Sequence, residues 1–171
     1  MTAAEALRAG RAVILPTDTV YGLCALPGNE DVLYTLKGRD RSKPIALVAA
    51  DVDSLLAVAP GLDRALLERF LPGPYTLVLA LPDGGRIGVR VPNLPAAAAD
   101  VLAQTGPVIC TSANLAGGSD PRSVADVPES IRAAVGAIVD AGDLPGVPST
   151  VLDVTGTEPR VLREGAGKYD P

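Results

Sequence analysis

The chain has 171 residues, which fits one folded domain, and we predict a single domain over residues 1–171. Hydrophobic residues make up 47% of the sequence and charged residues 20%, as is typical of a globular protein rather than a disordered one. The absence of histidine excludes Ser-His-Asp catalysis and histidine-ligated metals, and the net charge of −5 argues against a protein that coats nucleic acid.

The sequence alternates short β-rich runs with helical patterns, which predicts an α/β domain. Thr2 and Glu5 form a capping box for a first helix that ends at Gly10. Asn29 is predicted to cap a second helix, which ends near Gly38. In chain order, the elements predicted up to residue 70 are helix 2–10, strand 12–15, helix 29–36, strand 45–49 and helices 53–58 and 62–70.

The same alternation continues in the second half of the chain. The run Pro-Asp-Gly-Gly at 82–85 is a turn signal between two strands. The segment 114–127 is long and rich in Gly, Ser and Pro, which in a compact domain indicates a functional loop. In chain order, the remaining predicted elements are strands 76–81 and 87–91, helix 95–104, strand 108–111, helix 129–135 and strands 137–140, 150–154 and 160–162.

Two further features concern the compartment. No apolar run approaches the roughly 18 residues of a membrane helix, and the N-terminus lacks the apolar stretch of a signal peptide, so we expect a cytoplasmic protein without membrane contact. Cys24 and Cys110 match no metal-binding spacing. We predict that both are buried free thiols in a reducing compartment.

The first candidate site is the basic run Lys-Gly-Arg-Asp-Arg-Ser-Lys-Pro at 37–44, which holds four of the fifteen cations. One interpretation is a solvated helix terminus, whose exposed cations complement the helix dipole and contribute little to stability. The other is a rigid loop between Gly38 and Pro44 whose Lys and Arg side chains converge on a polyphosphate. The charge pattern alone leaves both interpretations open.

Other candidates follow the ends of predicted strands, where ligands bind in open α/β sheets. The run Cys-Thr-Ser-Ala-Asn at 110–114 offers the Ser112 hydroxyl and the Asn114 amide, and the run at 16–22 is rich in hydroxyls. Ordinary turn hydrogen bonds are the alternative explanation for both. Arg86 and Arg90 lie four apart on a predicted strand, which places both on one face, suitable for lining a cleft.

Together these motifs resemble the YrdC-like family of L-threonylcarbamoyladenylate synthases. The matching stretches run in the family's order from Pro16 to Ala166, and they are PTDTVYGL, KGRDRSKP, LPGPYTLVL, GVRVP, TSANLAG, PSTVLDVT and LREGA. The resemblance covers the family's catalytic domain only, without the extra C-terminal domain of longer members. It implies an α/β fold with a twisted, open, mixed and mostly parallel sheet, helices on both faces and a large central ligand cavity.

The resemblance also assigns roles residue by residue. It identifies the family's catalytic tetrad as Lys37, Arg39, Ser112 and Asn114. It places the threonine contacts at Thr19, Arg90, Ser112 and Ser149. It places the ATP contacts at Arg39, Lys43, Arg86, Asn114, Arg163 and Arg122 or Ser123. It implies no protein ligand to a metal, because Mg²⁺ is expected to arrive with ATP. The chain departs from some members at Val48, where they place a polar threonine contact, and in a shorter connection between Leu23 and Lys37.

The implied reaction makes threonylcarbamoyl-AMP and pyrophosphate from L-threonine, bicarbonate and ATP, for modification of tRNA next to the anticodon. Its nucleophile is a carbamate, which is already an anion, so the lack of histidine is no obstacle. The protein must instead bring two anions together, which requires cations and aimed donors. The implied partners are the downstream threonylcarbamoyl-transferase machinery, with at most weak tRNA contact.

Three alternatives remain at this stage. The first is a tRNA- or double-stranded-RNA-binding module of the same fold without synthase activity, against which the net charge and the 3% of aromatic residues count. The second is a related branch of the fold with a different activity or none; such branches depart from the tetrad. The third is a carbamoyl-transfer domain of the hydrogenase-maturation kind, but those lie in longer chains with zinc-finger cysteine spacings that this sequence lacks.

Overall fold

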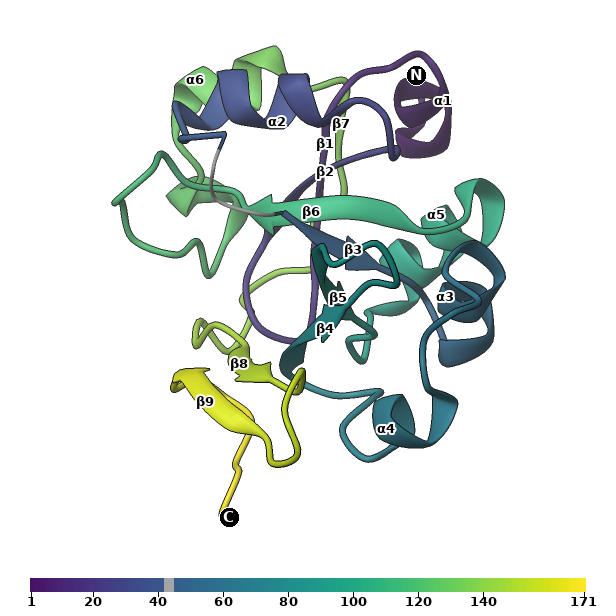
Figure 1. Ribbon diagram of the computed structural model, residues 1–171. Helices are drawn as coiled ribbons and strands as arrows, with labels where there is room; N and C mark the ends of the chain where they lie inside the picture. Colours follow the sequence, from purple (N-terminus) through teal and green to yellow (C-terminus); the bar gives the residue numbers. More distant parts are fainter. Residues whose placement is uncertain (42–44) are drawn as a thin grey trace.

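The computed structural model describes residues 1–41 and 45–171, so the predicted nucleotide contact Lys43 lies outside the described residues. In this part of the chain, nine strands form one open sheet in the order β7-β1-β2-β6-β3-β5-β4-β8-β9 (Figure 1). The strands are β1 (Val13–Leu15), β2 (Gly22–Ala25), β3 (Ala46–Val48), β4 (Tyr75–Ala80), β5 (Arg86–Arg90), β6 (Val108–Ser112), β7 (Ala137–Ile138), β8 (Thr150–Asp153) and β9 (Arg160–Arg163). The helices are α1 (Ala3–Arg8), α2 (Glu30–Lys37), α3 (Val52–Val58), α4 (Arg64–Glu68), α5 (Ala96–Thr105), α6 (Glu129–Ala134) and the 3-10 helix η1 (Val124–Asp126).

The predicted α/β fold with a mixed sheet is confirmed. Three strand pairs are parallel, namely β1–β7, β3–β5 and β4–β8. The other five pairs are antiparallel, so parallel pairing takes a smaller share of the sheet than expected. The reason lies in the connections, because the short links from β1 to β2 and from β4 to β5 can close only antiparallel pairs.

Every predicted helix and strand is present, with ends shifted by at most two residues, but β2 and the short helix η1 were not predicted. All four residues of β2 are buried, so the strand lacks the apolar–polar alternation that reveals a strand with one face in solvent. The capping box of Thr2 and Glu5 is confirmed. Asn29 occupies the predicted N-cap position of α2, but its backbone is not extended and its side chain makes no capping hydrogen bond.

Helices lie on both faces of the sheet, as predicted. In β1, Val13 and Leu15 pack in a buried cluster with residues of α1 and α5, while Ile14 points to the opposite face and packs with residues of α2 and α6. Figure 1 shows α2 and α6 side by side, over the end of the sheet that carries β1 and β2. α5, with ten residues, is the longest helix within 1–41 and 45–171, and no helix there has the length and apolar character to cross a membrane.

A third buried cluster lies beneath α3 and α4, on one face of β4 and β5. The other face of these two strands lines the cavity described below. Leu77 and Leu79 of β4 and Val89 of β5 pack in this cluster. Because strand side chains alternate between faces, the intervening residues of β4 and β5 point away from the cluster. These intervening residues form part of the cavity described below.

We expect a side chain at Gly22 to destabilise the fold, because β2 passes very close to β6 at this point. A Cβ atom on Gly22 would overlap the Cys110 Sγ. Overpacking of this kind costs about 1–3 kcal/mol, so Gly22→Ala should lower the free energy of unfolding by that amount in urea titrations. Gly61→Ala is the control, because the nearest atom to its added Cβ is 4.0 Å away. Equal stabilities of the two variants would contradict the prediction.

Candidate functional site

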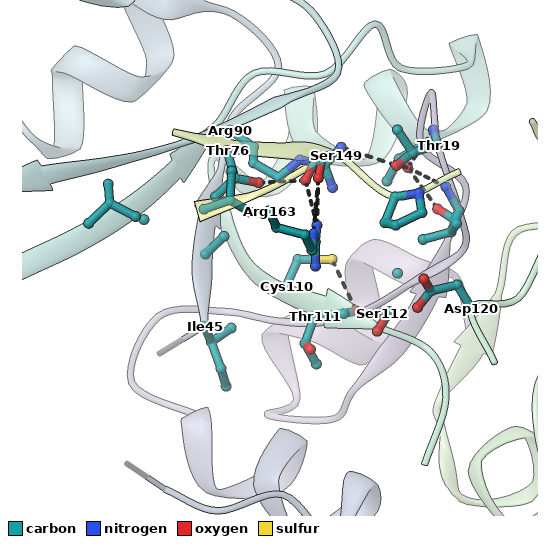
Figure 2. Close-up of a pocket in the computed structure, with 18 of the residues that line it drawn as sticks. Thr19, Ile45, Thr76, Arg90, Cys110, Thr111, Ser112, Asp120, Ser149 and Arg163 are labelled. Atoms are coloured by element: carbon teal, nitrogen blue, oxygen red, sulfur yellow. Dashed lines mark hydrogen bonds between the residues drawn. The ribbon is translucent and has the colours of Figure 1, made fainter. Parts of the chain in front are cut away.

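A cavity of about 510 Å³ opens against β3, β4, β5 and β6, and its walls come from segments far apart in the sequence (Figure 2). This volume lies in the range of small-molecule sites. The polar and charged lining residues are Thr17, Thr19, Arg39, Thr76, Arg86, Arg90, Thr111, Ser112, Asp120, Ser149 and Arg163. The other lining residues are Val20, Gly22, Ile45, Ala46, Val78, Ile87, Gly88, Cys110, Pro148, Val151 and Leu162.

The charge of the cavity wall is strongly positive. Arginines at 39, 86, 90 and 163 line it, against a single carboxylate among the described lining residues, that of Asp120. Arginine binds carboxylates and phosphates through planar, charge-assisted pairs of hydrogen bonds. The cavity is therefore suited to a ligand, or a pair of ligands, with several negative charges.

Lys37 lies behind this wall rather than in it, at the C-terminal end of α2. Its side chain is buried, with the residue 4% exposed, so the expectation that it is an exposed cation is wrong. The Lys37 ammonium donates hydrogen bonds to the Ser112 carbonyl at 2.8 Å, the Ser112 Oγ at 3.2 Å, the Asn114 carbonyl at 3.0 Å and the Asn114 Oδ1. Burial, followed by the nearby Arg39, lowers the pKa of Lys37 to about 8, so it stays largely protonated at neutral pH.

The loop after β6 takes its shape from these bonds and from Asn114. The Asn114 side-chain amide donates to the Gly118 carbonyl at 2.8 Å and to the Asp120 carboxylate at 3.4 Å. A second, smaller pocket of about 190 Å³ lies here, lined by Lys37, Arg39, Ser112, Asn114, Ala116 and Gly117. Since Arg39 and Ser112 line both pockets, the predicted catalytic tetrad forms one group around the boundary between the two.

Arg39 reaches the cavity because α2 ends abruptly at Gly38. Gly38 adopts a left-handed conformation, with φ of 63°, which terminates the helix and redirects the chain. The Arg39 Nη1 then donates to the Thr111 Oγ1 at 2.9 Å. This bond aims the guanidinium at the cavity from the α2 side, as the polyphosphate interpretation of the basic run required.

Arg90 is held by an acid that the sequence analysis did not single out. Its Nη2 donates to the Asp18 Oδ1 at 3.3 Å and to the Thr19 Oγ1 at 3.2 Å, and both members of the ion pair are largely buried. The other Asp18 oxygen accepts the backbone N–H of Asn93 at 3.0 Å. The Arg90 Nε is buried without a hydrogen-bond partner among the described residues, so one strong donor remains for a ligand.

A further part of the cavity wall is built by Ser149, Thr76 and Arg163, which Figure 2 shows close together. The Ser149 Oγ lies 2.7 Å from the Thr76 Oγ1, and the Arg163 Nη2 donates to the Ser149 Oγ at 3.1 Å and to its carbonyl at 2.7 Å. Burial, then the nearby Arg90 and Arg39, lower the pKa of Arg163, while Asp120 opposes the shift. A side chain at Gly165 would overlap the Pro148 carbonyl, so this glycine lets the segment after β9 lie against Ser149.

Some predicted residues lie elsewhere. Arg122 and Ser123 do not line the cavity; the Arg122 Nε donates to the Leu144 carbonyl at 2.8 Å. Val48 is buried in the core between β6 and β5 rather than in the cavity. Arg86 lines the cavity mouth, where it is largely exposed and lies 3.6 Å from Asp153.

Thr76, Asp18 and Asp120 also belong to the site, although they were not predicted from the sequence. Thr76 had a usable signal, because it alternates with the core residue Leu77 on a predicted strand. Asp18 lies inside a quoted motif, but only the fold places it beside Arg90. Within residues 1–41 and 45–171, no three Cys, Asp or Glu side chains gather in a way that could hold a metal ion.

Comparisons with known proteins identify the family and the fold of the chain. The Sua5/YciO/YrdC family model, described as "Telomere recombination", matches residues 5–165. The chain is 34% identical to a threonylcarbamoyl-AMP synthase of Bacillus subtilis over 95% of this chain and 52% of the relative. It is 37% identical to a threonylcarbamoyl-AMP synthase of Chromohalobacter salexigens over 91% of this chain and 92% of the relative.

A solved structure of P. abyssi Sua5 complexed with L-threonine matches with a TM-score of 0.82 and 31% identity, over 95% of this chain and 53% of that one. The chain therefore spans about half the length of the B. subtilis and P. abyssi relatives, and nearly all of the C. salexigens relative.

We expect Lys37→Met to destabilise the protein, because it leaves the buried acceptors of Ser112 and Asn114 without their charged donor. A loss of about 1–3 kcal/mol in the free energy of unfolding should appear in urea titrations at pH 7. Arg41→Met is the matched control, since Arg41 pairs with Asp31 at the surface, where both side chains are more than half exposed. Its loss should stay below about 1 kcal/mol. Similar small losses in both variants would show that Lys37 does not support the loop.

Proposed function

The chain belongs to the Sua5/YciO/YrdC family, and from this membership we propose that it is a threonylcarbamoyl-AMP synthase. It forms threonylcarbamoyl-AMP and pyrophosphate from L-threonine, bicarbonate and ATP, in the cytoplasm, for transfer of the threonylcarbamoyl group to tRNA by downstream machinery. The observation that carries the proposal is that Arg39, Arg90 and Arg163 line the same cavity as the hydroxyls of Thr19, Ser112 and Ser149. The names of the relatives and the threonine complex of P. abyssi Sua5 support the choice of substrates.

We place threonine at the end of the cavity that contains Arg90. The Arg90 guanidinium, with its unpartnered Nε, is suited to the threonine carboxylate. Thr19, Ser112 and Ser149 are hydroxyl side chains in the same wall, and they suit the amino and hydroxyl groups of the ligand. Asp18 contributes indirectly, because it holds Arg90 through the 3.3 Å ion pair.

ATP takes the part of the cavity around Arg39, Arg163 and Arg86. These guanidiniums neutralise phosphate oxygens, and we retain Lys43 and Asn114 as nucleotide contacts while leaving out Arg122, whose guanidinium donates to a backbone carbonyl. Mg²⁺ arrives with the nucleotide, because it prefers phosphate oxygens and water to a cage of protein ligands. Asp120 is the carboxylate that lines this space.

The proposed reaction has two steps. The threonine amine and bicarbonate combine with loss of water to give a carbamate, and a carbamate oxygen then attacks the α-phosphorus of ATP. The bond from that phosphorus to the pyrophosphate breaks, and pyrophosphate leaves. The arginines neutralise two anions that would otherwise repel each other, and the walls orient them for attack. The recessed cavity also limits hydrolysis of the product by bulk water.

The structure gives no support to the RNA-binding alternative. Sequence-tolerant binding of single-stranded RNA uses exposed aromatic rings on which bases stack. Here Phe70 packs on Tyr75 at 5.6 Å between ring centroids and on Tyr169 at 6.0 Å, and Tyr21 is fully buried. Most of the few aromatic rings are therefore occupied within the fold.

We expect the protein to release pyrophosphate from ATP and Mg²⁺ only when threonine and bicarbonate are both present, because the carbamate is the nucleophile. A coupled pyrophosphate assay in CO₂-free buffer, with and without added bicarbonate, measures this requirement. Arg39→Ala should lower the rate at least tenfold, which corresponds to about 1.4 kcal/mol of transition-state stabilisation. Equal release without bicarbonate would rule out the carbamate mechanism.

We expect Asp18→Asn to weaken threonine binding selectively, because it removes the charge that holds Arg90. The KM for threonine should rise about tenfold, while the KM for ATP should change less than about twofold. Steady-state kinetics with each substrate varied in turn separates the two effects. Asp31→Asn is the control, since Asp31 pairs with Arg41 at the surface. An equal rise in both KM values would show that Asp18 supports the whole cavity rather than Arg90.

A further inference from the structure

Cys24 and Cys110 face each other across the sheet, although 86 positions separate them in the sequence. Cys24 of β2 is the register partner of Cys110 of β6 in an antiparallel pair, and the two Sγ atoms lie 2.7 Å apart. Directly opposed residues in antiparallel strands have Cα atoms about 4.5–5.5 Å apart, which falls within the range of disulfide-bonded cysteines. Both are free thiols in this structure, as the sequence analysis predicted.

The two thiols differ in what can reach them. Cys110 lines the cavity, and Figure 2 shows it in the wall beside Thr111 and Ser112. Cys24 does not line the cavity; both thiols are buried, at 2% exposure for Cys24 and 6% for Cys110, and they pack in the same cluster beneath α1 and α5. A small molecule that enters the cavity therefore meets Cys110, and Cys24 lies directly behind it.

The charges around the pair also favour reaction at Cys110 before reaction at Cys24. The hydrogen bond with the Cys24 thiol, and then the cations Arg90 and Lys37, lower the pKa of Cys110, although burial opposes them. Burial raises the pKa of Cys24. Since the thiolate is the nucleophile in cysteine chemistry, Cys110 is the better attacking group and Cys24 is suited to resolve its product.

We propose that Cys24 and Cys110 form a redox modification site, which a small hydroperoxide entering through the cavity converts into a reversible disulfide within the chain. The Cys110 thiolate attacks the terminal oxygen of the hydroperoxide, the O–O bond breaks, and water or an alcohol leaves, so that Cys110 becomes a sulfenic acid. The Cys24 sulfur attacks the Cys110 sulfur, water leaves, and the S–S bond forms. Two equivalents of an external thiol reverse the change and become a disulfide themselves.

Two simpler roles for the pair make different predictions. A metal held by the two thiolates would need further ligands, and the described residues contain no group of three suitable side chains. Passive packing of two thiols in the core would leave them free in the presence of peroxide, or would lead to separate oxidation of each. The proposed site instead requires that the two thiols disappear together.

The test uses the full chain, reduced and then treated with a few equivalents of hydrogen peroxide. Remaining thiols are alkylated in denaturant, and intact mass and peptide mapping locate the change. We expect both thiols to be lost together, the peptides containing Cys24 and Cys110 to be linked within one chain, and dithiothreitol to restore both. Free thiols at both positions, or links only between chains, would overturn the proposal.

Two variants and one native measurement establish the order of reaction. Cys24→Ser should leave Cys110 as a sulfenic acid that dimedone traps, whereas Cys110→Ser should leave Cys24 as a free thiol under the same exposure. In the unsubstituted protein, brief treatment with N-ethylmaleimide should label Cys110 well before Cys24, a result that does not depend on how the variants fold. Labelling of Cys24 first, or dimedone capture at Cys24 in Cys110→Ser, would contradict attack from the cavity side.

Discussion

The buried ammonium of Lys37 is the interaction on which the rest of the site depends. It connects the end of α2 to the end of β6 and to the loop that follows, through the backbone carbonyls and side chains of Ser112 and Asn114. A charge so deeply buried is tolerated only when acceptors surround it, and here the acceptors belong to residues that lie at the cavity. Lys37 therefore supports the loop that carries Ser112 and Asn114.

Three of the cavity arginines are also held in place, each by a different kind of partner. Asp18 holds Arg90, the Thr111 hydroxyl holds Arg39, and the Ser149 carbonyl holds Arg163. Cations fixed in advance need little rearrangement when anionic ligands bind, which would favour the reaction between two anions proposed above.

The close approach of β2 to β6 brings Cys24 and Cys110 together. Gly22 has no side chain, which lets β2 approach β6 closely enough for Cys110 to occupy the space beside it. Two residues further along β2, Cys24 lies opposite Cys110. The wall that presents Ser112 to the cavity is thus also the place where oxidation would join two strands.

The sequence by itself determined the order of helices and strands, the two-sided helix layers and the motifs that supply Arg39, Arg90, Ser112, Ser149 and Arg163, because these depend on local patterns and on motif identity. It did not reveal β2, whose fully buried residues lack an alternating pattern. Nor could it show that Lys37 is buried, that Asp18 holds Arg90 or that Cys24 meets Cys110. Each of these facts depends on contacts between segments distant in the chain, and only the tertiary structure, including the pairing of β2 with β6, brings such segments together.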